Sequence, residues 1–92
     1  MFYIIAYDTP SNKRRRKMAK EIKAYARRVQ KSVYEANLER AQFLKMVEAV
    51  ERVIDEKDDN VRIYNVPKDA VSDITVYGSV PLIDMSDYDY DG

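Results

Sequence analysis

An aspartate at the end of an apolar segment, followed closely by a basic cluster, is the arrangement in this chain best suited to chemistry. Residues 2–8 read FYIIAYD, and five consecutive basic side chains run from Lys13 to Lys17. A carboxylate held at the end of a rigid strand can bind a hard divalent cation such as Mg²⁺ or Mn²⁺. Basic residues at the start of a helix attract phosphate. Together these features predict a protein that binds or cleaves nucleic acid.

The composition excludes several other kinds of chemistry. The chain has 92 residues, no histidine and no cysteine. Because no side chain has an ordinary pKa near neutrality, paired-histidine cleavage of the metal-free ribonuclease kind is excluded. Disulfides and thiolate metal sites are excluded as well, which suits a reducing cytoplasm. If the chain hydrolyses phosphodiester bonds, a metal ion must therefore generate the hydroxide and stabilise the developing charge.

Charge is unevenly distributed, although the formal net charge is zero. Residues 1–32 carry ten Lys and Arg against two acidic residues, whereas residues 55–92 carry ten Asp and Glu against three basic residues. Such a polarised protein can present a positive face to a polyanion, although a solvated helix face would show the same basic run. The chain shows no signal-peptide pattern and no stretch of about 20 apolar residues, so we expect a cytoplasmic protein that does not enter membranes.

Hydrophobic patterning predicts one small domain over residues 1–83. Helices are expected at 13–27 and 39–55, and strands at 2–8, within 28–36 as one strand or two, at 61–66 and at 74–77. Strands interleaved with two helices favour an α+β, ferredoxin-like βαββαβ sandwich, in which both helices cover one face of an antiparallel sheet. The acidic residues 84–92 are expected to form a flexible C-terminal tail.

The first strand is apolar on both faces. Its side chains alternate, with Phe2, Ile4 and Ala6 on one face and Tyr3, Ile5 and Tyr7 on the other. Since the helices can cover only one face, the other needs a partner, and a second copy related by a twofold axis is the simplest choice. In such a homodimer Asp8 can meet its symmetry mate, and two adjacent carboxylates share a proton or bind a cation. The alternative is that Asp8 only starts the turn before Pro10.

Three segments together resemble the CRISPR-associated protein 2 family. They are the Tyr7-Asp8 pair, residues 13–38 (KRRRKMAKEIKAYARRVQKSVYEANL) and residues 54–64 (IDEKDDNVRIY). The resemblance covers most of residues 2–66 and implies a ferredoxin-like homodimer. It also implies a C-terminal strand that pairs with the partner subunit, for which residues 74–76 and 82–83 match loosely.

The resemblance also implies roles for individual residues. Asp8 matches the acidic position implicated in metal binding and phosphodiester hydrolysis, so it is the candidate catalytic and Mg²⁺- or Mn²⁺-binding residue. Asn12 stands where relatives often have a second acid. The basic start of the first helix matches a surface suited to the backbone of duplex DNA, contributed by Arg14, Arg15, Arg16 and Lys17.

The family resemblance implies two compatible functions in CRISPR adaptation, the capture of new spacers. In one, the dimer holds double-stranded DNA and bridges the CRISPR integrase subunits. In the other, two Asp8 side chains hold a metal ion that supports hydrolysis of DNA or of single-stranded RNA. A toxin-type endoribonuclease on the same fold, acting without an integrase, remains the alternative. The acidic tail is a candidate either to contact the integrase or to screen the basic face, through Asp87, Tyr88, Asp89, Tyr90 and Asp91.

Overall fold

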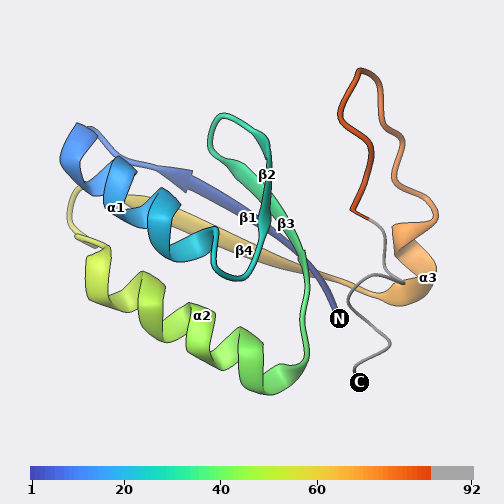
Figure 1. Ribbon diagram of the computed structural model, residues 1–92, viewed down its shortest axis with the longest axis horizontal. Coiled ribbons are helices and arrows are strands. Elements are labelled where there is room, and N and C mark those ends of the chain that lie inside the picture. Colours follow the sequence, from blue (N-terminus) through green and yellow to red (C-terminus); the bar gives the residue numbers. More distant parts are fainter. Residues whose placement is uncertain (84–92) are drawn as a thin grey trace.

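The computed structural model describes residues 1–83, which form a four-stranded antiparallel sheet with two long helices packed on one face (Figure 1). The elements in chain order are β1 (Phe2–Asp8), α1 (Asn12–Ile22), β2 (Arg27–Gln30), β3 (Val33–Asn37), α2 (Arg40–Val53), β4 (Asn60–Val66) and α3 (Lys68–Val71). The strand order is β2-β3-β1-β4, and β1 is antiparallel to both of its neighbours. This is the ferredoxin-like βαββαβ sandwich that the sequence predicts.

Local capping and pairing determine where the elements begin and end. The Ser11 hydroxyl accepts a hydrogen bond from the Arg14 amide at 3.1 Å, so α1 begins directly after Ser11. It ends at Ile22 rather than at residue 27, because Arg27 already pairs with Glu35 in the sheet. Residues 28–36, left open as one strand or two, form β2 and β3 with a bulge between Arg28 and Gln30.

Residues 74–77 do not form a strand, so this prediction is wrong for the single chain. Pro67 ends β4, and the chain then makes the short helix α3 before entering a loop. Apolar residues in 74–77 match a strand pattern, but a strand exists only where a neighbour accepts and donates backbone hydrogen bonds. Pairing of this segment with a partner subunit stays a prediction. The predicted acidic tail, residues 84–92, lies outside the described residues.

The main core lies between the sheet and the two long helices. Tyr3, Ile5 and Tyr7 of β1 face the helices and are all buried there. They belong to one cluster with Met18 and Ile22 of α1 and Met46 and Val50 of α2. The rings of Tyr3 and Phe43 stack with centroids 4.5 Å apart. Burial of alternate β1 residues therefore fixes which way the intervening side chains point. Among residues 1–83, no helix is long and apolar enough to span a membrane.

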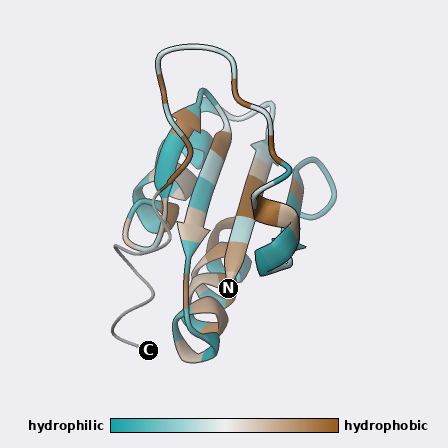
Figure 2. Ribbon diagram, turned by 90° about the vertical axis from the view of Figure 1, so that its right-hand side faces the viewer, coloured by the Kyte–Doolittle hydropathy of each residue, from teal (hydrophilic) through white to brown (hydrophobic). Residues whose placement is uncertain are grey.

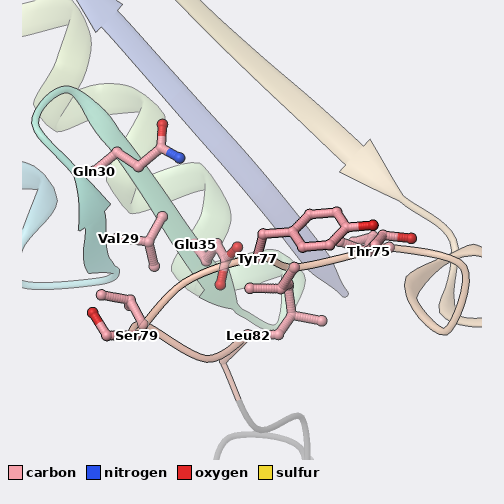
Figure 3. Close-up of a pocket in the computed structure, with 10 residues that line it drawn as sticks. Val29, Gln30, Glu35, Thr75, Tyr77, Ser79 and Leu82 are labelled. Carbon is pink, nitrogen blue, oxygen red and sulfur yellow. The ribbon is translucent and has the colours of Figure 1, made fainter.

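The opposite face of the sheet is partly covered by the chain's own residues 67–83, here called the C-terminal segment. Phe2 is fully buried against Val71 and Ile83 in a second apolar cluster. Figure 2 shows apolar stretches along this segment, and Figure 3 shows it passing alongside β2 and β3. The Ile83 amide donates to Glu35 Oε1 at 3.0 Å. The sequence predicts that a second copy of the chain covers this whole face. That prediction is wrong for the part around Phe2, which the chain's own C-terminal segment covers.

Candidate nucleic-acid and metal site

Asp8 is the last residue of β1, and it is exposed on the face of the sheet opposite α1 and α2. Its two chain neighbours, Tyr7 and Thr9, are only 4% and 3% exposed. Beside Asp8 lies a hollow of about 160 Å³, lined by Ala6, Tyr7, Asp8, Ser32, Val33, Asn60 and Arg62. The carboxylate thus reaches solvent at the part of the sheet that the C-terminal segment leaves uncovered.

A hard divalent cation fits this position only if water and substrate phosphate supply most of its ligands. Among residues 1–83, no group of three or more His, Cys, Asp or Glu side chains is placed to hold a metal ion together. Mg²⁺ often binds through one or two carboxylates and completes its shell with water and substrate phosphate. The exposed Asp8 carboxylate fits this mode of binding as a single protein ligand.

The densest polar network near Asp8 centres on Asp59, in the loop between α2 and β4. Its side chain is completely buried and accepts hydrogen bonds from Arg14 Nε at 2.8 Å and Arg14 Nη2 at 3.0 Å. It also accepts from the Tyr7 hydroxyl at 3.3 Å, from the Thr9 hydroxyl, and from the Asp55 amide at 3.0 Å. One carboxylate therefore joins β1, the start of α1 and the loop before β4.

The electrostatics of this network favour an Asp59 that is ionised at neutral pH. Hydrogen bonds from Arg14 are the main reason that the pKa of Asp59 lies well below its usual range, and they outweigh the opposing effect of burial. The same hydrogen bonds raise the pKa of Arg14. Burial raises the pKa of Tyr7, which therefore stays protonated and able to donate. The partly exposed Arg14 and the buried Asp59 are thus both charged at neutral pH.

Sequence reasoning did not single out Asp59. Glu, Lys, Asp and Asn in succession over residues 56–60 are typical of a solvated polar turn. One signal was available, since Asp59 lies directly before an apolar strand and inside the 54–64 segment that carries the family resemblance. Arg62, which lines the hollow beside Asp8, was missed in the same way.

The structure separates the four predicted nucleic-acid-binding residues into two pairs. Arg14 is bound to Asp59, and Arg15 donates to the Thr9 carbonyl at 2.6 Å and to the Asn12 side chain. Arg16 and Lys17, in contrast, are exposed on α1. Because α1 packs against the covered face of the sheet, the basic run and Asp8 do not share one pocket. A separate groove between α1 and α2 is lined by Lys17, Lys20, Glu21, Arg52 and Val53.

The fold and the site define a small ferredoxin-like protein with an exposed carboxylate at the end of a central strand and a basic helix after it. Residues 1–74 match the family model of the CRISPR associated protein Cas2. The chain therefore belongs to the Cas2 family.

Individual relatives agree with this assignment. A CRISPR-associated endoribonuclease Cas2 of Thermus thermophilus is 33% identical over 90 residues, covering 98% of this chain and 96% of the relative. One from Moorella thermoacetica is 38% identical over 90 residues, covering 92% and 94%. Among solved structures, Streptococcus pyogenes Cas2 has a TM-score of 0.74 at 31% identity, covering 85% of this chain and 100% of that one. A hypothetical protein of Thermus thermophilus has a TM-score of 0.76 at 35% identity, covering 88% and 94%.

Proposed function

We propose that this protein acts in CRISPR adaptation as a homodimer that hydrolyses phosphodiester bonds with Mg²⁺ or Mn²⁺ held by Asp8. The single observation that carries the proposal is the exposed Asp8 carboxylate at the end of β1, beside an uncovered hollow. The endoribonuclease names of the Cas2 relatives support hydrolysis of RNA. Family membership favours this role over a toxin-type endoribonuclease that acts without a CRISPR partner.

Dimerisation through the uncovered part of the sheet is part of the proposal. That surface offers Ala6 and Val33 in the hollow and Tyr64, which is 48% exposed on β4. Tyr64 pairs with Ile4 in the sheet register, so it belongs to the same face as Asp8. An apolar surface of this kind, continued by a strand-end carboxylate, is suited to a twofold contact that brings two Asp8 side chains together.

In the proposed mechanism, Asp8 and its symmetry mate would hold the metal ion, with the scissile phosphate completing its ligand shell. A bound divalent ion supplies an activated water and stabilises charge on the phosphate. Arg62 is exposed on β4, two residues from Asn60, the register partner of Asp8, and on the same face of the sheet, so it can neutralise a second phosphate oxygen.

Duplex DNA, in this proposal, is held by the basic start of α1 while the integrase subunit is the protein partner. Of the predicted residues Arg14 to Lys17, Arg16 and Lys17 have free access to solvent and are the phosphate contacts that the geometry favours. Contacts of this kind are made to the backbone, so binding is expected to be independent of base sequence.

The test is a cleavage assay on matched single- and double-stranded RNA and DNA with Mg²⁺, with Mn²⁺ and with EDTA. Asp8→Asn should abolish metal-dependent cleavage while the dimer persists. Asp69→Asn, a matched loss of an exposed carboxylate on α3, should cleave as the wild type does. Full hydrolysis by Asp8→Asn would place the chemistry elsewhere.

A further inference from the structure

Asp59 is a buried, ionised carboxylate that the proposed mechanism does not use. Replacement of a buried ion pair by well-packed apolar residues is often neutral or stabilising, so such a pair is weak evidence of a stabilising role. Asp59 nevertheless has five hydrogen-bond donors from four different residues. The identity of those donors indicates what this arrangement achieves.

Two of the donors are the residues that flank Asp8. Tyr7 and Thr9 both turn inward from β1 and donate their hydroxyl groups to Asp59, whereas Asp8 between them is exposed. Asp59 also directly precedes Asn60, the register partner of Asp8 on β4. The backbone of Asp8 is therefore held at three points. Tyr7 before it and Thr9 after it are both bound to Asp59, and Asn60, the residue after Asp59, is its register partner in the sheet.

Further contacts make Thr9 the most restrained residue of this loop. Its hydroxyl donates to Asp59 and accepts from the Ser11 amide at 3.1 Å, and its carbonyl accepts from Arg15 Nη2 at 2.6 Å. On the other side of Asp8, the Tyr7 amide donates to the Ser32 carbonyl at 3.0 Å. A β-strand normally frays at its end, and these contacts keep the last residue of β1 in extended geometry.

We propose that Asp59 is a positioning residue for Asp8: by holding Tyr7 and Thr9 it fixes the Asp8 carboxylate on the uncovered face of the sheet. Arg14 acts through Asp59, as the counter-ion that keeps this buried acceptor charged. The inference rests on the proposed function in so far as Asp8 binds the metal ion. It adds a role for a residue that contacts neither the ion nor the substrate, since the Asp59 side chain has no access to solvent.

Two measurements test this role, and the first requires no metal. Hydrogen exchange of the backbone amides of residues 7–9 is measured in the wild type, in the double variant Tyr7→Phe/Thr9→Val and in Asp59→Asn. Exchange at these amides should accelerate by about tenfold or more, while the β3 amides of Tyr34 and Ala36 stay protected. Unchanged exchange at residues 7–9 in the double variant would overturn the proposal. The double variant keeps the Arg14–Asp59 pair, so it serves even if Asp59→Asn does not fold.

The second measurement is the affinity for Mn²⁺ alone, by calorimetry and electron paramagnetic resonance, with the dimer verified by sedimentation. Loss of outer-shell support typically costs about 10–100-fold in metal affinity, so the double variant should bind Mn²⁺ at least about tenfold more weakly. The single variant Thr9→Ser keeps both hydroxyl donors and should bind Mn²⁺ with wild-type affinity. Val50→Ala, a destabilising change in the core away from Asp8, should leave the affinity unchanged.

The outcomes separate this inference from the proposed function. If Mn²⁺ binding depends on Asp8 but is unaffected by the double variant, the positioning role is wrong and the proposed function stands. A loss of affinity that Val50→Ala reproduces would assign the effect to general stability and overturn the role. If the wild type and Asp8→Asn bind Mn²⁺ equally, the proposed metal site at Asp8 is wrong. The role of Asp59 in positioning a metal ligand is then wrong as well.

Discussion

The contrast between Arg14 and its exposed neighbours leads to a quantitative prediction about DNA binding. Arg16 and Lys17 face solvent, whereas the Arg14 guanidinium is bound to the buried Asp59. Each phosphate contact that a protein makes to duplex DNA contributes about 0.9 to the slope of log affinity against log salt concentration. Replacement of both exposed residues by Ala should therefore lower this slope by about 1.8 per protomer bound.

The predicted change is large enough to measure. When salt is raised from roughly 50 to 200 mM, the affinity of the wild type should fall by a factor about ten times larger than that of the double variant. The assay is fluorescence anisotropy of a labelled duplex titrated at four salt concentrations, with the wild type, Arg16→Ala/Lys17→Ala, Arg14→Ala and Lys68→Ala. Lys68 is an exposed basic residue on α3 and serves as the matched control, with no expected change in slope.

Arg14→Ala is the variant that decides whether the structural reasoning is right. Because its guanidinium is engaged by Asp59, its loss should destabilise the fold without lowering the salt slope. The reasoning is refuted if Arg14→Ala lowers the slope by about 0.9, the value of one phosphate contact, or if the Arg16→Ala/Lys17→Ala slope equals that of the wild type. The second result would place the duplex on a surface that includes neither Arg16 nor Lys17.

Three further predictions concern stability and metal removal. Hydrogen bonds with Arg14 lower the pKa of Asp59 in the folded protein. The stabilisation from ionised Asp59 is therefore complete above the pKa of about 3.9 that Asp has in the unfolded chain. It is lost as the pH falls from there toward the pKa of Asp59 in the folded protein. The difference in Tm between the wild type and Asp59→Asn should accordingly shrink between about pH 5 and pH 2, and a difference independent of pH would contradict this. Met46→Ala removes a fully buried side chain between sheet and helices and should cost about 2–5 kcal/mol in urea unfolding, and a cost near zero would show that the core is misplaced. EDTA should abolish hydrolysis but leave the dimer intact in sedimentation, because the proposed contact is largely apolar; dissociation on chelation would make the metal ion the main link between subunits.

Periodicity and alternation in the sequence were sufficient to predict the layers of this fold. β1, α2 and β4 lie within two residues of their predicted ranges, because each buries one regularly spaced set of apolar side chains. The end of α1 was predicted five residues late, since Tyr25 and Ala26 continue a helical pattern although the chain has already turned toward β2. The pairing of Arg27 with Glu35 in the β2–β3 hairpin, which no helical pattern encodes, requires the chain to leave the helix before residue 27.

The candidate site was predictable in part for similar reasons. Strand alternation places Asp8 on the opposite face from Tyr7, but its role as a metal ligand rests on the family resemblance and stays a prediction. The engagement of Arg14 was not predictable, because five successive basic residues look alike until the α2–β4 loop brings Asp59 beside one of them. Coverage of Phe2 by Ile83 likewise depends on how the chain returns after α3, and no local pattern encodes that return.

The packing of Ile83 onto Phe2 has a practical consequence for any shortened version of this protein. The stretch that matches the family ends at residue 74, yet Phe2 owes part of its cover to Ile83, nine positions further on. Truncation at the family boundary would leave an aromatic ring and the neighbouring Ile4 facing water, which is a recognised cause of aggregation. Recombinant versions that stay in solution should therefore retain at least residue 83.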